Sequence, residues 1–312
     1  MQIRYIILCD KPGRLGNRIL WHAHFISFVE EHPNFRIINA SFEDYYGVFK
    51  SFDNDTLGRF PEKTNRLTFL SKFQLFRKFQ FLTTYTVYRI LDRFKVDNDW
   101  VTSYDYDYDK TIDLNDNQVF NQLSKSKYNF IRGFWCNSNV INSRDTIKQH
   151  FKLTKSTPIG SSFNVGLHVR RTDYKYLLKG KYFFDIPTYK NWIDQIIEKH
   201  KDRPDLKIFI CSDCFEELRN IPELDHSRIQ IANRSLIDDF DILTQCDVVY
   251  AVPSTFSAMA AFLGQHKIIF LENESAEIHN LRISTNIIED FYTQTKSDFI
   301  EIYKASSGNT TF

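Results

Sequence analysis

The sequence has almost no net charge and no long apolar run. Its 40 Lys and Arg residues oppose 39 Asp and Glu residues, which leaves a formal net charge of +1 over 312 residues. Proteins that bind nucleic acid usually have a clear basic excess, so this balance argues against a nucleic-acid partner. No apolar run approaches the ~18 residues that a membrane-spanning helix needs, and the N-terminus lacks the parts of a signal peptide. These absences predict a cytoplasmic protein.

Cysteine is too scarce and too scattered for a disulfide framework. The five cysteines are an odd number, and without a signal peptide they predict a reducing compartment. Only Cys211 and Cys214 have the spacing of a metal-binding pair. Because no second pair and no suitably spaced His accompanies them, the sequence argues against a zinc site.

The sequence does contain enough apolar material for about two packed domains. Hydrophobic residues make up 42% of the chain and aromatic residues 16%. In the second half, apolar strands are expected at 164–170, 206–211, 228–232, 247–252 and 267–271. Helices are expected between them at 187–203, 215–221, 236–246 and 255–263. This alternation predicts a parallel sheet with helices on both faces, in a Rossmann-like domain at about 163–275.

The first half begins in the same way and then becomes irregular. A strand at 5–8, a loop at 11–16, a helix at 17–31 and a strand at 35–39 predict a second α/β unit. The aromatic and basic segment 69–95 is expected to be a core helix, with contact to a membrane surface as the alternative. The acidic segment 97–116 is expected to be turn-like, with a solvated loop at 104–109. Ligands of open α/β sheets bind beyond the carboxyl ends of strands, so we expect the site in a cleft between the two units.

The sharpest motif is a cluster of polar residues at the end of the strand at 164–170. Alternation points His168 and Arg170 to one side and Arg171 to the other. A guanidinium at a strand end is a fixed positive fork suited to phosphate oxygens. The alternative is an ion pair between Arg170 and Asp173. Because His168, Arg170 and Arg171 occur together, we favour the phosphate site.

A second candidate anion site is the loop that joins the first strand to the first helix. It contains Gly13 and Gly16 and leads to Asn17. Glycine permits positive φ and close backbone approach, and a helix start offers free N–H groups to an anion. A plain tight turn explains the loop equally well, because neither the P-loop nor the dinucleotide-binding spacing is present.

Two helix starts in the second half also carry polar groups. Ser254, Thr255 and Ser257 follow the strand at 247–252, where they can cap the next helix or bind a phosphate together with its N–H groups. Asp239 lies in the acidic first turn of another helix. Its carboxylate either complements the helix dipole or reads a purine edge or a ribose.

Taken together, these motifs resemble those of the fucosyltransferase superfamily that uses GDP-fucose. The segment Gly13-Arg-Leu-Gly16-Asn17 resembles the N-terminal loop of the α1,2-fucosyltransferases, glycosyltransferase family 11. The segment that begins at His168 resembles the shared His-x-Arg-Arg motif, and 239–257 resembles the third motif. The matches occur in order over about 11–271. Thr172 departs from the α1,2 group, which usually has Gly there, and is similar to the α1,6 and protein O-fucosylating branches.

The resemblance implies a GT-B fold, in which two Rossmann-like domains face each other across a cleft. Residues 1–155 would be the acceptor domain and 156–312 the donor domain, with a C-terminal helix that could return to the first. Arg170 would neutralise the departing diphosphate, His168 and Asp239 would contact guanine, and Arg171 would bind the donor or brace the loop through Asp213. The donor-binding set implied in this way is Gly16, Asn17, His168, Arg171, Asp213, Asp239, Ser254, Thr255 and Ser257.

The resemblance also implies an inverting transfer of L-fucose from GDP-fucose to a glycan hydroxyl, with no metal or other cofactor required. The expected acceptor atom is O2 of galactose. The alternatives are another linkage, a protein acceptor, or a catalytically silent module that binds sugar nucleotides or glycans. Asp173 is the first candidate for the general base and Asp10 the second, because 174–179 lacks the Glu of the α1,6 branch. The absence of an anchor indicates a bacterial or viral source, or a chain from which an anchor has been trimmed.

Overall fold

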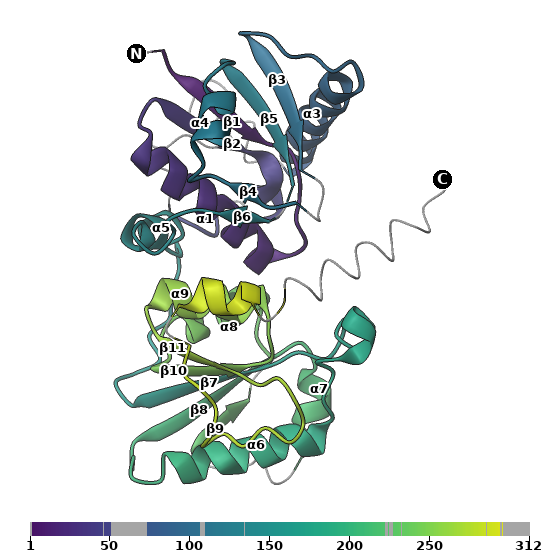
Figure 1. Ribbon diagram of the computed structural model, residues 1–312. Helices are drawn as coiled ribbons and strands as arrows, with labels where there is room; N and C mark the ends of the chain where they lie inside the picture. The colour runs from purple at the N-terminus through teal and green to yellow at the C-terminus, as the bar shows by residue number, and fades with distance from the viewer. Residues whose placement is uncertain are drawn as a thin grey trace. The chain divides into compact units, whose positions relative to one another are not determined.

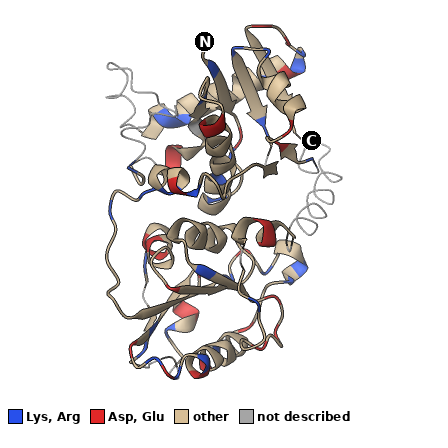
Figure 2. Ribbon diagram, turned by 60° about the vertical axis from the view of Figure 1, so that its left-hand side comes forward, with Lys and Arg blue, Asp and Glu red and all other residues tan. Residues whose placement is uncertain are grey.

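The computed structural model divides into two compact α/β units, with the boundary between Thr154 and Lys155 (Figure 1). It describes residues 2–45, 47–50, 74–106, 110–133, 135–221, 224, 227–231, 233–284, 286–293 and 295. None of the helices in these ranges is long and apolar enough to cross a membrane. Basic and acidic residues are interspersed along the ribbons of both units (Figure 2), as the net charge near zero leads one to expect.

The first unit is built on a four-stranded parallel sheet with the strand order β2-β1-β5-β3. Its strands are β1 (Arg4–Leu8), β2 (Phe35–Asn39), β3 (Val101–Asp105) and β5 (Tyr128–Arg132). Its helices are α1 (Leu15–Glu31), η1 (Ala40–Tyr45), α3 (Gln74–Arg93), α4 (Asn117–Leu123) and α5 (Arg144–His150). The short strands β4 (Ile112–Asp113) and β6 (Cys136–Asn137) form a separate parallel pair.

Two long helices cover opposite faces of this sheet. Tyr88 of α3 packs with Ile7 and with Cys9, which follows β1 on the same face by strand alternation. The neighbouring positions Ile6 and Leu8 are fully buried and point to the other face, where α1 lies (Figure 1). The helix α1 is buried throughout residues 18–29, which explains why its apolar residues are not confined to one stripe.

The second unit is a five-stranded parallel sheet with the order β11-β10-β7-β8-β9. Its strands are β7 (Phe163–Val169), β8 (Leu206–Ser212), β9 (Ile229–Ile231), β10 (Val248–Ala251) and β11 (Lys267–Phe270). Its helices are η3 (Leu177–Gly180), α6 (Ile186–Lys199), α7 (Phe215–Leu218), α8 (Leu236–Leu243) and α9 (Thr255–Gly264). Every strand and helix predicted for this half is present, close to its predicted boundaries.

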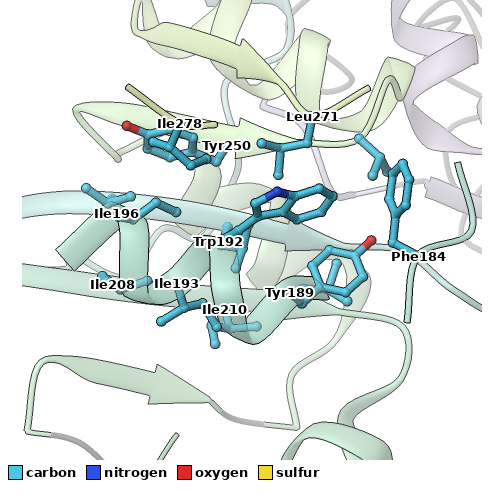
Figure 3. Packing of buried hydrophobic residues seen from close by; sticks show 14 of the residues in the cluster. Phe184, Tyr189, Trp192, Ile193, Ile196, Ile208, Ile210, Tyr250, Leu271 and Ile278 are labelled. Atoms are coloured by element: carbon cyan, nitrogen blue, oxygen red, sulfur yellow. The ribbon is translucent and has the colours of Figure 1, made fainter. Parts of the chain in front are cut away.

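The helix α6 carries the apolar core on one face of the second sheet. Trp192 is fully buried, and its ring meets those of Phe184 and Tyr189 edge to face at centroid distances of 5.0 and 5.2 Å (Figure 3). The indole N–H donates to the carbonyl of Ala276 at 3.2 Å, so the buried polar atom is satisfied. This packing holds α6 firmly against β7 and β8.

The other face of the second sheet depends on a glycine. A Cβ atom on Gly166 would lie 2.6 Å from Cδ2 of Leu243 and 3.1 Å from Sγ of Cys246. The absence of a side chain therefore lets the end of α8 approach β7 closely. His168 lies two residues further along the same face of β7. The close packing therefore brings the neighbouring helices to the position where the His-x-Arg-Arg segment begins.

Two predictions for the first unit were wrong or incomplete. The segment 97–116, expected to be turn-like, contains the edge strand β3, and the central strand β5 was not identified at all. Both strands mix polar with apolar residues, and pairing with neighbouring strands decides their conformation. The expected loop at 104–109 is strand at its first two positions, and 107–109 lie outside the described residues, as do positions 69–73 of the predicted helix.

Candidate active site

Both sheets have a topological switch point at their carboxyl edge. In the second unit β8 lies on one side of β7 and β10 on the other, and in the first unit β2 and β5 flank β1 in the same way. Ligands of open α/β sheets bind in the crevice at such points. The structure places the predicted residues of the second half around the end of β7. It places Asp10, Gly16 and Asn17 around the end of β1.

His168 is buried near the end of β7 and is held by the start of α9. Its Nδ1 lies 2.6 Å from Oγ of Ser257, and its ring contacts that of Phe256 at a centroid distance of 5.1 Å. Burial, reinforced by the positive charge of Arg170, lowers the pKa of His168 to about 3. The imidazole is therefore neutral at pH 7. Its Nε2 has no hydrogen-bond partner among the described residues and can face a ligand.

Arg170 follows β7 directly and forms a two-pronged ion pair with Asp173. Its Nε donates to Oδ1 at 2.9 Å and its Nη2 donates to Oδ2 at 2.6 Å. The guanidinium also lies 5.0 Å from the centre of the Tyr174 ring. This is the ion pair that the sequence offered as the alternative to a phosphate site. The Arg170 side chain keeps 15% of its surface exposed, and its Nη1 makes no hydrogen bond to a described residue, so donors remain for an anion.

Arg171 and Asp213 tie the ends of β7 and β8 together. The Asp213 carboxylate accepts from the backbone N–H of Arg171 at 2.9 Å and from the hydroxyl of Thr172 at 2.6 Å. The Arg171 guanidinium pairs with Glu217 at 3.0 Å and donates to the carbonyl of Phe184. The geometry matches a bracing arrangement through Asp213, although the contact is made by the backbone of Arg171 and not by its side chain.

Asp239 is a buried carboxylate in the first turn of α8. Its Oδ2 accepts from the backbone N–H of Ser212, at the end of β8, at 3.2 Å. Its Oδ1 is buried without a hydrogen-bond partner among the described residues and lies 3.8 Å from Nη1 of Arg234. Burial raises the pKa of Asp239 to about 6, and the charge of Arg234 opposes the rise. No sequence motif indicated Arg234, because it lies in a loop outside all of them.

The three hydroxyl residues around the start of α9 have different surroundings. Ser254 caps the helix, since its Oγ accepts from the backbone N–H of Phe256 at 3.3 Å. Ser257 is fully buried against His168, whereas Thr255 is only partly buried. Capping and the bond to His168 therefore account for two of the three without excluding ligand contacts from the nearby N–H groups.

Tyr174 connects the His-x-Arg-Arg segment to this helix start. Its hydroxyl donates to the carbonyl of Pro253 at 2.7 Å, and burial raises its pKa to about 12, so it stays protonated. Its ring lies against the Arg170 guanidinium. The sequence pattern indicated no role for Tyr174, because a single Tyr after a charged motif is not specific to any function.

The glycine loop of the first unit has a conformation that its sequence requires. Gly13 has φ +52°, and a side chain there would collide with the amide of Asn17. Gly16 is buried in the first turn of α1. The N-cap residue Arg14 makes no side-chain capping bond, and the backbone N–H of Leu15 is instead paired with the side chain of Tyr45.

Asp10 belongs to a charged cluster at the carboxyl edge of the first sheet. It accepts from the backbone N–H of Lys11 at 2.8 Å, and its Oδ2 lies 3.5 Å from Nε of Arg132. Arg132 also pairs with Asp105 at 3.1 Å, and Asp105 accepts from the hydroxyl of Tyr88 at 2.7 Å. The sequence did not reveal this cluster, because Arg132 and Asp105 end the two strands that it left unidentified.

A cavity of about 360 Å³ lies beside β3, within the first unit. Apart from Val96, its lining residues are polar, charged or tyrosine and come from the end of α3, from β3 and from α4: Asp92, Lys95, Val96, Asp97, Thr102, Ser103, Tyr104, Asp105, Tyr106 and Gln122. The hydroxyl of Tyr106, one of the lining residues, is buried without a hydrogen-bond partner among the described residues. Burial raises its pKa to about 12, so it remains a hydrogen-bond donor at pH 7.

The cysteines are buried thiols and form no disulfide. Cys211 points its Sγ at the carbonyl of Asp239, and Cys214 contacts the hydroxyl of Ser212 at 3.1 Å. Burial raises the pKa of both thiols, to about 11 for Cys214. Over the described ranges, no group of three or more His, Cys, Asp or Glu side chains is placed to hold a metal ion.

Two parallel α/β units, each with polar side chains at its switch point, define a protein with two Rossmann-like domains. Comparison with known families places it further. The chain belongs to glycosyl transferase family 11, whose family model matches residues 35–288. This match confirms the resemblance that the motifs predicted and makes the protein a glycosyltransferase. It includes His168, Arg170 and Asp239, whereas the glycine loop at 13–17 precedes it.

Two solved structures are similar to this chain at low sequence identity. A mutant of Arabidopsis thaliana FUT1 in complex with GDP is 13% identical and has a TM-score of 0.58, covering 92% of this chain and 75% of its own. POFUT1 in complex with GDP-fucose is 11% identical and has a TM-score of 0.47, covering 84% of this chain and 94% of its own. The likeness to FUT1 confirms the predicted GT-B fold. No curated protein matches the chain.

Proposed function

We propose that this protein transfers L-fucose from GDP-fucose to a carbohydrate hydroxyl, with O2 of galactose as the acceptor atom. The reaction inverts the anomeric carbon and requires no metal. Membership of family 11 supports the reaction class. The observation that carries the donor assignment is the buried Oδ1 of Asp239, which makes no hydrogen bond to a described residue and lies at the same sheet edge as Arg170. The FUT1 structure, which has the same fold, contains GDP.

In this proposal Asp239 recognises guanine. Guanine presents its N1–H and its amino group side by side, and a carboxylate can accept from both, whereas adenine lacks this pair of donors. With a pKa of about 6, Asp239 is mostly ionised at pH 7. A buried acceptor without a partner costs about 1–3 kcal/mol, and a bound guanine would remove that cost. The neutral His168 offers Nε2 for a further contact to the base.

Arg170 is assigned to the β-phosphate. When the acceptor oxygen attacks the anomeric carbon from the opposite face, the electron pair of the breaking C–O bond moves to the phosphate, and negative charge grows there. A guanidinium held in place before the reaction stabilises that charge at little reorganisation cost. Asp173 holds the Arg170 guanidinium through Nε and Nη2. The N–H groups of Nη1 therefore remain to donate to an anion.

The acceptor hydroxyl must also lose its proton. We keep Asp173 as the first candidate base and Asp10 as the second. Each carboxylate is held by an arginine, Asp173 by Arg170 and Asp10 by Arg132. Asp173 lies beside the guanidinium that is assigned to the leaving phosphate, which favours it over Asp10 in the first unit.

The proposal divides the chain into an acceptor part, 1–155, and a donor part, 156–312. The cavity beside β3 offers carboxylate and tyrosine side chains, which suit the hydroxyls and the apolar faces of a sugar. We assign the acceptor glycan to the first unit on this basis. We expect the protein to act in the cytoplasm.

The decisive experiment incubates the purified protein with GDP-fucose and lactose in the presence of EDTA. We expect GDP release and a product fucosylated at O2 of galactose, identified by NMR linkage analysis. Turnover that EDTA abolishes would contradict metal independence, and a different linkage would contradict the assigned acceptor atom. GDP binding without turnover on any acceptor would instead support a silent binding module.

A further inference from the structure

The helix α3 has two faces of opposite character. On its inner face, Tyr88 is buried to 1% exposure against Ile7 and Cys9, and Tyr85 packs with the same cluster. Its outer face exposes large apolar side chains along the whole helix and just beyond its end. These are Leu75 (83% exposed), Phe79 (64%), Leu82 (59%), Val87 (37%), Ile90 (52%) and Phe94 (71%).

These exposed residues form one stripe. The steps from Leu75 to Phe79 and Leu82, and from Ile90 to Phe94, are three or four residues, so the side chains follow one another along one side of the helix. Because the inner face already completes the packing on the sheet, the stripe is not needed for the core of the described unit. A contiguous exposed apolar surface of this kind marks an interaction site.

The charges on α3 indicate what the stripe binds. The helix contains four basic residues, Arg77, Lys78, Arg89 and Arg93, and one acidic residue, Asp92. The exposed basic residues lie beside the stripe. Lys78 is three residues after Leu75, and Arg93 is five helical turns after Leu75 and therefore on the same side of the helix. Asp92 is paired with Lys95 at 2.9 Å. The outer face therefore combines apolar side chains with uncompensated positive charge.

We infer that the outer face of α3 docks on an anionic membrane surface, with the helix lying parallel to the bilayer. Interfacial helices bury an apolar face near the headgroups and place Lys and Arg against lipid phosphates. The stripe defined above supplies the apolar face, and Lys78, Arg89 and Arg93 supply the charges. The inference concerns the first unit and does not depend on the proposed reaction.

Charge argues against two other occupants. In a symmetric pair of copies, the two α3 helices would bring their basic side chains together with only Asp92 from each to balance them, and like charges repel. The segment 51–73 has three acidic and four basic residues, so its net charge does not complement the helix either. An anionic lipid surface complements both the charge and the apolar stripe.

The test is co-sedimentation of the full-length protein with vesicles of phosphatidylglycerol or of phosphatidylcholine. We expect binding to phosphatidylglycerol that weakens as salt is raised, and little binding to phosphatidylcholine. The double variant L82E/I90E should lower the partition coefficient at least about tenfold, because it puts two charges on the surface that must enter the interface. Both side chains are more than half exposed, so the fold tolerates the change.

A matched control is Ile141→Glu, because Ile141 is 49% exposed in the same unit but lies outside the stripe. It should bind vesicles like the unmodified protein. Absence of vesicle binding by the unmodified protein, equal binding by L82E/I90E, or a dimer in light scattering that L82E/I90E dissolves would each overturn the inference. GDP release without vesicles, measured in parallel, should be equal in all three proteins, so a failed transfer reaction remains distinguishable from failed docking.

Discussion

The substitution Asp239→Asn should weaken GDP and stabilise the empty protein at the same time. A carboxylate that accepts from N1–H and from the amino group of guanine makes two charge-assisted hydrogen bonds, each worth about 1.5–3 kcal/mol. Asn keeps one acceptor but turns an NH₂ donor toward the donors of the base. We expect GDP binding to weaken by about 3 kcal/mol, which is on the order of a hundredfold in Kd. UDP binding should change far less.

The stability effect follows from the raised pKa of Asp239. Burial lifts that pKa from 3.8 in an ordinary aspartate to about 6, so the folded protein holds the proton more tightly than the unfolded chain. The ionised form is therefore disfavoured in the folded state by up to about 3 kcal/mol. This destabilisation is fully present above pH 6, fades as the pH falls, and is gone below pH 3.8. The Asn variant should be the more stable protein at pH 7, with an advantage that shrinks toward pH 4.

Calorimetric titration of GDP and UDP and urea denaturation at pH 7 and pH 4.5 measure both effects. A matched control is Asp238→Asn: Asp238 also lies in the first turn of α8, but its carboxylate belongs to the capping box with Ser235. That control should destabilise the protein without changing the preference for GDP over UDP. Equal weakening of GDP and UDP by Asp239→Asn would remove the residue from guanine recognition, and a loss of stability at pH 7 would refute the electrostatic reasoning.

Three further outcomes are expected. Arg170→Ala should lower kcat by about 10²–10³, from the loss of roughly 3–4 kcal/mol of charge stabilisation, and near-normal GDP release in that variant would disprove the assigned role. The ratio of GDP to UDP affinity should fall about tenfold between pH 7 and pH 5 as Asp239 is protonated, with no such fall in Asp239→Asn; UDP corrects for titration of the diphosphate. Gly166→Val should destabilise the protein by about 1–3 kcal/mol in thermal denaturation, because the side chain would enter the space of Leu243, and an unchanged Tm would contradict the close packing of α8.

The second unit was predictable because each of its strands is buried on both faces. A strand such as β7, with six of its seven residues buried, must be almost continuously apolar, and that run is visible in the sequence. The caps are local as well: Ser235 and Asp238 form the capping box that their spacing indicates, and Asp185 caps α6. Parallel topology then follows from the alternation of strands and helices, and it places His168 and Arg170 at the carboxyl edge.

The first unit was less predictable because its sheet carries polar residues inside its strands. Asn129 is fully buried at the centre of the sheet, where its amide donates to the backbone carbonyl of Ser126 at 3.2 Å. Asn is disfavoured in strands, so its presence argues against a strand in the sequence, and only the fold supplies the partner for its buried NH₂ group. The ion pair between Arg170 and Asp173 was foreseeable as an alternative, whereas the pairing of Arg132 with Asp10 was not.

The proposed nucleotide site and the charged cluster at the carboxyl edge of the first sheet therefore differ in how the sequence encodes them. The proposed nucleotide site uses residues at the end of β7 or just after it. The helices α8 and α9 bring Asp239 and Ser257 beside them. Residues that follow one another closely along the chain form a motif that can be recognised in the sequence. The charged cluster of the first unit draws on the ends of β1, β3 and β5, where Asp10, Asp105 and Arg132 meet only after three separate strands have paired. Each strand contributes one ordinary charged residue, so no short motif in the sequence records this cluster.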